Sequence, residues 1–391
     1  MFELLFLLLP VAVAYGWFMG RNSVKQTKQN AKDSLTLKYS TGLNYLLSNQ
    51  QDKAMEYLLE ALKVEDDTVE AHFAMANLFR RRGELDRALK VHEYLVRQPM
   101  LSDKEKQQAV FELGKDFYSA GLYDRAEKLF LKLMKSDLYG VNSLTYLLQI
   151  YQSIKDWHKG LEIEKTILKS DDKKLRHVLA NFYCELATIA YNKKQYIDEL
   201  ELLQRALELD PKSSRANFLM AQVFEAKEQY NEACKCYQEI FKQDPEFFPD
   251  VIEKMQQCYD KSDFKEQFYP FIKKVYKKTA STSALIKYLE HLQTSQSKDG
   301  AEEYILTALN RRPTIRGFKH LIKMQLNDDT DNKSRHHKSL DMIKELVAAY
   351  LKVRPRYSCK NCGFNSSVHY WSCPSCHDWE QLKPVRGLEG E

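Results

Sequence analysis

Residues 183–211, YCELATIAYNKKQYIDELELLQRALELDP, and residues 217–245, NFLMAQVFEAKEQYNEACKCYQEIFKQDP, follow one pattern, 34 positions apart. A period near 34 residues is typical of a solenoid built from helix–turn–helix units. Small residues let the two helices of a unit approach each other, and a proline ends the second helix. The matching positions are Ala187, Ala190, Leu203, Ala206 and Pro211 in the first copy, and Ala221, Phe224, Tyr237, Ile240 and Pro245 in the second.

The same pattern extends toward both ends of the chain, and its spacing resembles that of the tetratricopeptide repeat. We predict an all-α repeat array over residues 37–327, capped by a terminal helix at 314–327. The turns RGELDRA (82–88) and AGLYDRA (120–126) support this, because each places a glycine where the chain needs a positive φ. The other units are marked by Gly42, Tyr45, Ala54, Leu58 and Ala61, by Ala76, Phe79, Ala88, His92 and Leu95, by Gly114, Phe117, Ala126 and Phe130, more weakly by Leu148, Tyr151 and Gly160, by Cys258 and Phe268, and by Leu289, Ala301, Ile305, Ala308 and Pro313.

The composition fits a long helical array. At 391 residues the chain exceeds one ordinary core, and its 13 glycines and 10 prolines are few for that length. Lys and Arg total 59 against 54 Asp and Glu, which gives a formal net charge of +5. An excess this mild does not indicate a nucleic-acid partner.

Residues 1–20 are predicted to be a transmembrane anchor. Residues 4–19, LLFLLLPVAVAYGWFM, carry no charge, and about 20 apolar residues span a bilayer as a helix. The alternative is a secretory signal peptide, which should have basic residues before its apolar run. Here the basic residues follow it, and positive charge stays on the cytoplasmic side. We therefore expect an uncleaved single span, a connector at 21–36 and a body that faces the cytoplasm. The basic residues are Arg21, Lys25, Lys28 and Lys32.

Residues 328–353 are predicted to join the array to a last domain. The polar stretch 327–335, NDDTDNKSR, breaks the periodicity and marks a hinge. Apolar residues at helical spacing then predict a connecting helix, and they are Leu340, Ile343, Val347 and Tyr350.

The eight cysteines fall into two groups. Four lie in the array without metal-ligand spacing, and we interpret them as small buried apolar residues: Cys184, Cys234, Cys236 and Cys258. The other four form two C-x-x-C motifs separated by ten residues: Cys359 with Cys362, and Cys373 with Cys376. Thiolates at this spacing hold one metal ion from two sides in a tetrahedral site.

Residues 354–391 are therefore predicted to be a small metal-binding domain. Zinc is favoured and iron is the alternative, because both accept four thiolates. Four protein ligands leave no open coordination position, so the metal is structural or, if it is iron, electron-transferring. Disulfides or free thiols are disfavoured in a cytoplasmic body, and a four-thiolate site does not need the nearby His369 and His377.

Aromatic residues surround the two motifs. In so small a domain they form either its core, which we favour, or a docking face against the array. They are Tyr357, Phe364, Tyr370, Trp371 and Trp379.

The sequence contains none of the catalytic motifs G-x-x-x-x-G-K-[ST], G-x-G-x-x-G, H-E-x-x-H and G-x-S-x-G. Most of the ten histidines are scattered over predicted helices. We therefore expect a protein that is not an enzyme.

Three features occur together here: the apolar start MFELLFLLLPVAVAYGWFMGR, the repeat array, and the ending YSCKNCGF…YWSCPSC…KPVRGLEG. This combination resembles the lipopolysaccharide assembly protein B family of Gram-negative bacteria over the whole chain. The stretches YLLSNQQDKA, AGLYDRAE and NFYCELA add to the resemblance. It implies a non-enzymatic regulator of lipopolysaccharide biosynthesis in the bacterial inner membrane. It also implies a rubredoxin-like domain whose metal ligands are Cys359, Cys362, Cys373 and Cys376.

The resemblance also implies partners. The family is understood to promote degradation of the lipid A-committing UDP-3-O-acyl-N-acetylglucosamine deacetylase by the FtsH protease, and a YejM-type inner-membrane protein tunes this effect. Two alternatives come from other classes of protein. One is a membrane scaffold that assembles lipopolysaccharide synthesis and transport enzymes, and the other is a rubredoxin-type electron-transfer protein. The sequence is compatible with a homo-oligomer.

Overall fold

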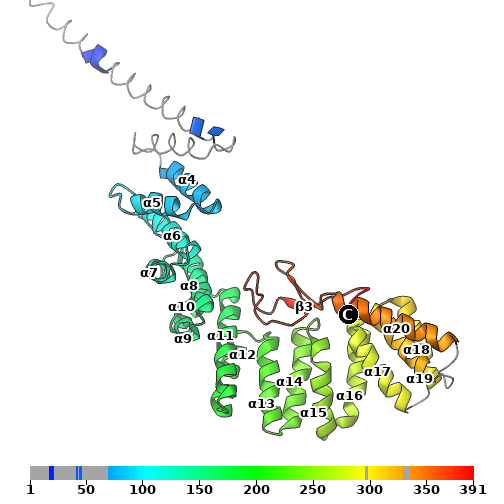
Figure 1. Ribbon diagram of the computed structural model, residues 1–391. Helices are drawn as coiled ribbons and strands as arrows, with labels where there is room; N and C mark the ends of the chain where they lie inside the picture. Colours follow the sequence, from blue (N-terminus) through cyan, green and yellow to red (C-terminus); the bar gives the residue numbers. More distant parts are fainter. Residues whose placement is uncertain (1–16, 22–40, 43, 46–68, 296–297, 329–334) are drawn as a thin grey trace, which may run out of the picture. The chain divides into compact units, whose positions relative to one another are not determined.

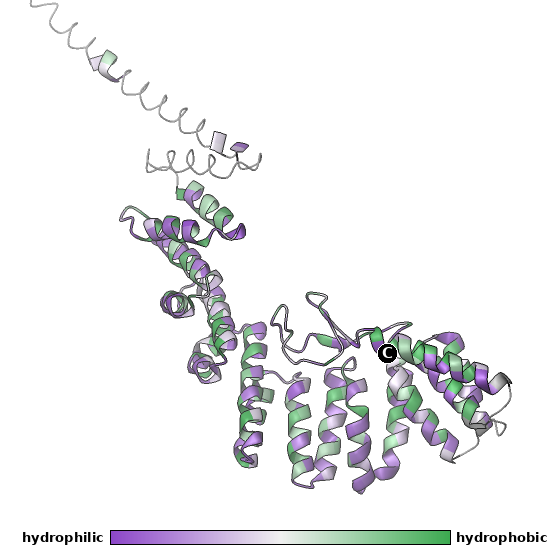
Figure 2. Ribbon diagram, in the orientation of Figure 1, coloured by the Kyte–Doolittle hydropathy of each residue, from purple (hydrophilic) through white to green (hydrophobic). Residues whose placement is uncertain are grey.

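The computed structural model of the chain describes residues 17–21, 41–42, 44–45, 69–295, 298–328 and 335–391 (Figure 1). These residues form two compact units, which are divided between Tyr139 and Gly140. Both units are built mainly from helices. Hydrophobic and hydrophilic residues are interleaved along these helices, as expected where one face of each helix packs on its neighbours (Figure 2).

Most of the predicted anchor and connector lies outside the described residues. Residues 17–21 are helical and exposed, and the guanidinium of Arg21 lies 5.1 Å from the ring centroid of Trp17. Within the described residues, no helix has both the length and the apolar character that a bilayer span requires. The first predicted repeat is described only at residues 41–42 and 44–45, so Ala54, Leu58 and Ala61 also lie outside the described part.

The first unit confirms the second and third predicted repeats. Helix α4 (Val69–Arg81) packs on α5 (Leu85–Val96), and α6 (Asp103–Ser119) packs on α7 (Tyr123–Leu133). The small residues predicted at the helix contacts are fully buried, as Ala76, Ala88 and Ala126 show. A Cβ at Gly114 would lie 2.8 Å from the ring of Phe130, so this position needs glycine for packing.

A buried ion network joins the helices α4, α5 and α6 of the first unit. The carboxylate of Asp116 is fully buried and accepts from both His92 and Arg80. The distances are 2.5 Å from His92 Nδ1 to Asp116 Oδ2 and 2.7 Å from Arg80 Nη1 to Asp116 Oδ1. Arg80 also pairs with Glu112. Such a network fixes the register of the helices because each buried charge depends on its partners.

The second unit continues the array. Its helices confirm the predicted repeats from the fifth to the eighth, and the prolines at 211, 245 and 313 follow the second helix of their units. The predicted contact residues are buried, including Ala187, Ala206 and Ala221. The helix pairs are α11 (Lys173–Asn192) with α12 (Tyr196–Leu209), α13 (Ser214–Ala226) with α14 (Tyr230–Gln243), α15 (Ile252–Lys261) with α16 (Phe268–Thr279), and α17 (Thr282–Ser295) with α18 (Lys298–Arg311); η1 (Phe248–Asp250) and η2 (Lys265–Gln267) are short 3-10 turns.

The weak fourth repeat has a broken second helix. Helix α8 (Gly140–Ile154) is followed by two short helices, α9 (Trp157–Glu162) and α10 (Glu164–Ser170). Ile163 separates them at φ −93° and ψ 2°, outside the α-helical region. The break explains why only three positions of the repeat pattern could be recognised in this unit.

Five of the turns inside the units share one backbone position. In these five, the residue two places before the second helix has a positive φ: Gly83 and Gly121 in the first unit, and Lys155, Lys194 and Glu228 in the second. The two glycines confirm the prediction from the turn sequences. The lysines and the glutamate adopt the same conformation at a cost of about 1–2 kcal/mol each.

Two further helices follow the repeats. Helix α19 (Ile315–Asp328) packs on α17 and α18 and confirms the predicted terminal helix. Helix α20 (Arg335–Val353) packs on α19 and confirms the predicted connecting helix. Most of the predicted hinge, residues 329–334, lies outside the described residues.

The last segment forms a small sheet. Strands β2 (Asn365–Ser366), β1 (Tyr357–Cys359) and β3 (Leu382–Pro384) pair antiparallel in that order. Ser358 pairs with Lys383 on one side and with Asn365 on the other. We call residues 354–391 the ribbon domain. The protein is thus a mostly helical tetratricopeptide-type solenoid with a small ribbon at its end.

We predict that Gly160→Ala destabilises the second unit. A Cβ at this position would lie 2.3 Å from the ring of Phe182, which is fully buried. Overpacking of a well-filled core costs about 1–3 kcal/mol. Urea unfolding should show this loss, whereas His158→Ala, at an exposed position of the same helix, should leave the midpoint nearly unchanged. Equal midpoints for both variants would contradict the predicted close packing.

A second feature of the array is a buried carboxylate on α12. The side chain of Glu199 is fully buried, and within the described part of the chain neither of its oxygens has a hydrogen-bond partner. Burial raises the pKa of Glu199 to about 7, because the ionised form loses its hydration.

Glu199 should therefore make stability fall as pH rises. Between an ordinary pKa of 4.5 and the folded pKa of about 7, the folded state keeps a proton that the unfolded chain releases, so the loss accumulates in this window and then levels off. Glu199→Gln should be more stable than the parent at about pH 8, and the difference should shrink toward about pH 4. Urea unfolding at both pH values measures this. Glu201→Gln, at an exposed position of α12, should show no such trend.

Candidate metal centre and its docking on the array

The four predicted cysteines lie on two turns of matching backbone geometry. In the first, the N–H of Cys359 donates to the carbonyl of Phe364 (2.8 Å), and its own carbonyl accepts from the N–H of Gly363 (3.0 Å). In the second turn, the carbonyl of Cys373 accepts from the N–H of His377 (2.8 Å). Each turn therefore closes on its first cysteine.

The position after each C-x-x-C motif has a left-handed backbone. Gly363 has φ 74°, which confirms the turn predicted there, and no atom lies within 4 Å of a Cβ built on it. His377 occupies the corresponding place with φ 60°. The strained residue in the second turn was not expected from the sequence, because only the first turn shows a glycine.

The four thiols converge on one point. Their Sγ atoms all lie within 4.8 Å of one another, and Sγ–Sγ is 3.7 Å for both Cys359–Cys376 and Cys362–Cys373. A tetrahedral ion with metal–sulfur bonds of about 2.3 Å holds its sulfurs about 3.8 Å apart, whereas a disulfide needs about 2.05 Å. The donor set therefore fits one structural metal ion, zinc or iron.

The surroundings of the thiols differ. Cys359 and Cys373 are buried, and Cys362 is exposed. The N–H of Phe364 donates to Cys362 and lowers the pKa of its thiol to about 7. Burial raises the pKa of Cys376 to about 12. A metal ion would hold all four groups as thiolates, which is why such sites bind metal more weakly in acid.

Glu380 anchors the ribbon domain to the array. Its side chain is 7% exposed. Oε2 accepts from the N–H (3.2 Å) and the hydroxyl (2.7 Å) of Ser214, and Oε1 accepts from the hydroxyl of Ser213 (3.0 Å) and the amide of Asn181 (3.4 Å). Ser213 is the N-cap of α13, so the carboxylate lies at the positive end of that helix.

Arg215 follows Ser214 on α13 and faces two tryptophans of the ribbon domain. Its guanidinium lies 5.1 Å from the Trp379 ring centroid and 5.8 Å from that of Trp371. Arg215 is 4% exposed, and it pairs with Glu185 at 2.6 Å. A desolvated cation over an aromatic face contributes about 2 kcal/mol.

The second cysteine turn is bound directly by the array. Gln152 on α8 donates through Nε2 to the carbonyl of His377 (2.7 Å) and to the hydroxyl of Ser372 (3.0 Å). Its Oε1 accepts from the indole N–H of Trp379 at 3.1 Å. One side chain of the array therefore holds the backbone next to Cys376.

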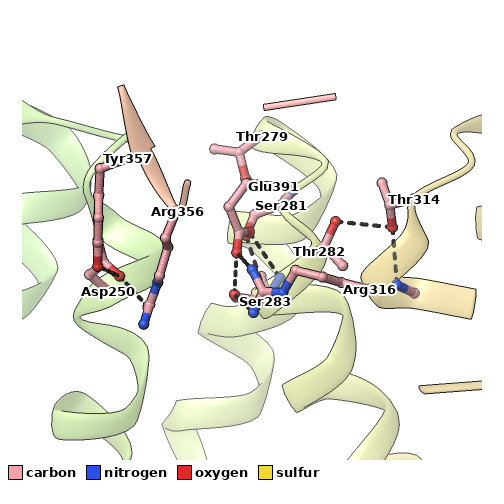
Figure 3. A network of polar contacts seen from close by, with 12 residues as sticks. Asp250, Thr279, Ser281, Thr282, Ser283, Thr314, Arg316, Arg356, Tyr357 and Glu391 are labelled. Atoms are coloured by element: carbon pink, nitrogen blue, oxygen red, sulfur yellow. Dashed lines mark hydrogen bonds and ion pairs between the residues drawn. The ribbon is translucent and has the colours of Figure 1, made fainter. Parts of the chain in front are cut away.

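Ion pairs extend the contact along the array. Lys383 on β3 pairs with Asp244. Asp250 Oδ1 accepts from Arg356 Nη2 (2.5 Å) and from the hydroxyl of Tyr357 (2.9 Å), as the left part of Figure 3 shows. The ribbon domain thus runs along one end of the neighbouring array helices (Figure 1).

Glu391 repeats the chemistry of Glu380 at another helix. Its side chain is 5% exposed, and Oε2 accepts from the hydroxyl of Ser281 (2.7 Å) and the N–H of Ser283 (3.0 Å) at the start of α17 (Figure 3). Its carboxylate also pairs with Arg316. Burial opposes ionisation, but Arg316 and the serine donors outweigh it and lower the pKa of Glu391.

The aromatic residues divide between the two predicted roles. Tyr357 and Phe364 pack in the core of the ribbon domain with its cysteines. Trp371 packs on the array, with its ring centroid 4.9 Å from that of Phe247. Trp379 contacts Arg215 and Gln152, as described above, and Tyr370 is 43% exposed. Some of these aromatic residues therefore form the core of the domain and others dock it on the array, so neither predicted role accounts for all of them.

The cysteines of the array are separate from this centre. All four are buried free thiols, which confirms their interpretation as apolar residues. Burial raises the pKa of Cys184 to about 12 and that of Cys234 to about 11. A thiol held in its neutral form is a poor metal ligand and a poor nucleophile.

The chain is similar to known proteins from end to end. Residues 357–384 match a rubredoxin metal binding domain, and residues 71–99 and 214–247 match tetratricopeptide repeats. Lipopolysaccharide assembly protein B of Escherichia coli strain K12 is 37% identical over 390 residues, covering 100% of both chains. The chain belongs to the lipopolysaccharide assembly protein B family. The Haemophilus influenzae member is 32% identical over 397 residues, again over 100% of both chains.

Solved structures of repeat proteins resemble the chain more distantly. A tetratricopeptide repeat protein from Parabacteroides merdae overlaps 72% of this chain and 100% of its own, with 14% identity and a TM-score of 0.35. The assignment to the lipopolysaccharide assembly protein B family therefore rests on sequence. The four cysteines lie within the span that matches the rubredoxin metal binding domain.

We predict that Glu380→Gln loosens the ribbon domain without emptying the metal centre. The amide keeps the shape of the side chain but loses its charge at the start of α13, and a charged hydrogen bond contributes about 1.5–3 kcal/mol. Hydrogen exchange of residues 354–391 should become faster while metal content stays constant. Glu246→Gln is the comparison variant, since Glu246 is 37% exposed and reaches the ribbon domain only through longer pairs with Lys360 (3.4 Å) and Arg386 (3.8 Å), so its effect should be much smaller. Exchange that is as slow as in the parent would show that Glu380 does not hold the domain.

Proposed function

We propose that this chain is a membrane-anchored adaptor that regulates lipopolysaccharide biosynthesis by promoting degradation of the lipid A deacetylase by the FtsH protease. The observation that carries the proposal is the full-length similarity to lipopolysaccharide assembly protein B, from the first repeat to the ribbon domain. The fold supports it, because a solenoid offers an extended surface for a protein segment.

In this proposal the chain does no chemistry of its own. The donor set of four cysteines would fill a tetrahedral coordination shell, which leaves no position for a catalytic water. The ion would serve to hold Cys359, Cys362, Cys373 and Cys376 together. Gln152 and Ser214 of the array would then bind a ribbon domain of fixed shape, so the domain braces the array.

The proposed location is the bacterial inner membrane, with residues 1–20 as a single span and the body in the cytoplasm. The basic residues that follow the apolar run support this orientation. An anchor beside a membrane-embedded protease would raise the local concentration of any client that the array holds. A YejM-type membrane protein would be positioned to oppose it.

The direct experiment is the half-life of the lipid A deacetylase after depletion of this chain, with FtsH still present. A longer half-life is expected for an adaptor. An unchanged half-life would favour the scaffold alternative, in which the chain gathers lipopolysaccharide synthesis and transport enzymes without changing their turnover.

We predict that the double variant Cys359→Ser, Cys362→Ser loses the metal, releases the ribbon domain from the array and lengthens the half-life of the deacetylase. Metal analysis and hydrogen exchange of residues 354–391 measure the first two effects. Cys236→Ala, a buried thiol of the array, is the matched control and should retain the metal. Full regulation by a metal-free variant would contradict the bracing role.

Replacing iron by zinc tests the electron-transfer alternative. If the ion is structural, zinc can replace iron without loss of regulation. If the ion transfers electrons, zinc cannot replace iron, because zinc does not change its oxidation state. Loss of regulation in the zinc-loaded protein would therefore favour electron transfer.

A further inference from the structure

Helix α20 carries large apolar side chains on a face that the rest of the described chain leaves open. The helix lies next to α19 at the end of the array (Figure 1), yet none of its side chains from residue 337 to 353 is fully buried. Met342 and Leu346 are each 72% exposed, and Val353 is 85% exposed. A helix that packs on one neighbour should be polar on the face that meets water. A run of apolar residues on that face indicates an interaction surface.

The exposed residues repeat with the spacing of a coiled coil. Met342, Leu346, Ala349 and Val353 are all exposed and follow one another at steps of 4, 3 and 4 residues. We call these four residues the α20 seam. In the heptad notation a to g, Leu346 and Val353 occupy position a, and Met342 and Ala349 occupy position d. A seam of this kind packs against a second helix that has the same repeat.

The residues that flank the α20 seam differ between its two sides. Position g holds Glu345 and Lys352, which are exposed and form no ion pair within the described part of the chain. Position e holds Ile343 and Tyr350. In a parallel pair of helices position g faces e, so the charges would meet apolar and aromatic side chains. In an antiparallel pair g faces g and e faces e, so charge meets charge.

One antiparallel register of two copies satisfies the apolar and the charged positions together. Leu346 would pack on Ala349 of the second copy, and Met342 would pack on Val353 of the second copy. The same register places Glu345 opposite Lys352 of the second copy. Because such a pair has twofold symmetry, each of these contacts occurs twice. The α20 seam is therefore complementary to itself in charge and in apolar character.

The neighbouring registers lack this complementarity. A shift of one heptad in one direction places Glu345 opposite Glu345 of the second copy and Lys338 opposite Lys352. A shift in the other direction places Lys352 opposite Lys352 of the second copy. A further shift would pair Lys338 with Glu345, but it would also place Leu346 opposite the cation of Arg335. Like charges and a charge against a leucine both disfavour these pairings.

We propose that α20 is the contact surface of a symmetric homodimer, in which two copies of this helix pair antiparallel and Glu345 of each copy bonds to Lys352 of the other. The α20 seam is short, so the interface is small and the dimer should be weak, with a Kd on the order of micromolar. The surface lies apart from the four cysteines and from the docking contacts of Glu380. The proposal does not depend on the adaptor role.

Sedimentation equilibrium of the purified, metal-loaded full chain in density-matched detergent tests the proposal. We expect a reversible monomer–dimer equilibrium between about 1 and 100 µM. Leu346→Glu should leave the chain monomeric over this range, because it places a charge in the middle of the seam. Val368→Glu is the matched control and should dimerise like the parent, since Val368 is 56% exposed in the ribbon domain. A monomeric parent would overturn the proposal and would favour a helix of a different protein as the occupant. Dimerisation of Leu346→Glu with the affinity of the parent would also overturn it.

Charge reversal tests the register. Glu345→Lys and Lys352→Glu should each raise the Kd of the dimer about tenfold, because each sets two like-charge contacts across the seam. The double variant should restore the parent affinity. Lys338→Glu is the matched control, because Lys338 occupies the same heptad position of α20 but lies beyond the proposed contact.

Far-UV circular dichroism verifies that each variant is folded. A double variant as weak as the single ones, or an equal loss in Lys338→Glu and Lys352→Glu, would overturn the proposed pairing.

Discussion

The carboxylate of Glu380 at the start of α13 is the contact on which the arrangement of the second unit depends. A buried carboxylate is tolerated only where donors surround it, and the donors here come from two different array helices. A shift of the ribbon domain along the array would leave this charge without partners. Glu391 imposes the same condition at α17, so two charges together fix the register of one domain on the other.

The metal centre is therefore part of a larger polar interface. Within the part of the chain that the structure describes, the array is bonded to the backbone beside the thiols, through Gln152 and the carbonyl of His377. The left-handed backbone at His377 belongs to the closed turn around Cys373, and an ion that gathered the four sulfurs would hold this turn closed. Metal binding and docking thus stabilise the same short segment.

The repeats and the thiolate cluster could be predicted because each follows a spacing rule. Alanines at 34-residue intervals are buried where two helices touch, and two C-x-x-C motifs are sufficient to identify four ligands. The docking contacts follow no such rule. Nothing in the neighbours of Glu380 marks it as different from an exposed glutamate, and its partner Ser214 lies 166 positions away. The positive φ at Lys155, Lys194 and Glu228 was missed for a similar reason, because the residue type does not reveal the conformation.

The long sequence separations in this interface set the order in which the molecule can assemble. Trp379 bonds to Gln152 across 227 positions, so the array must be folded before the ribbon domain has a surface to meet. Repeats fold through local contacts and need no ion, whereas the ribbon needs both an ion and the finished array. Synthesis also delivers the ribbon after the array. Docking of the ribbon domain and uptake of the metal would then be coupled late in folding, and metal supply would decide how many newly made chains complete this step.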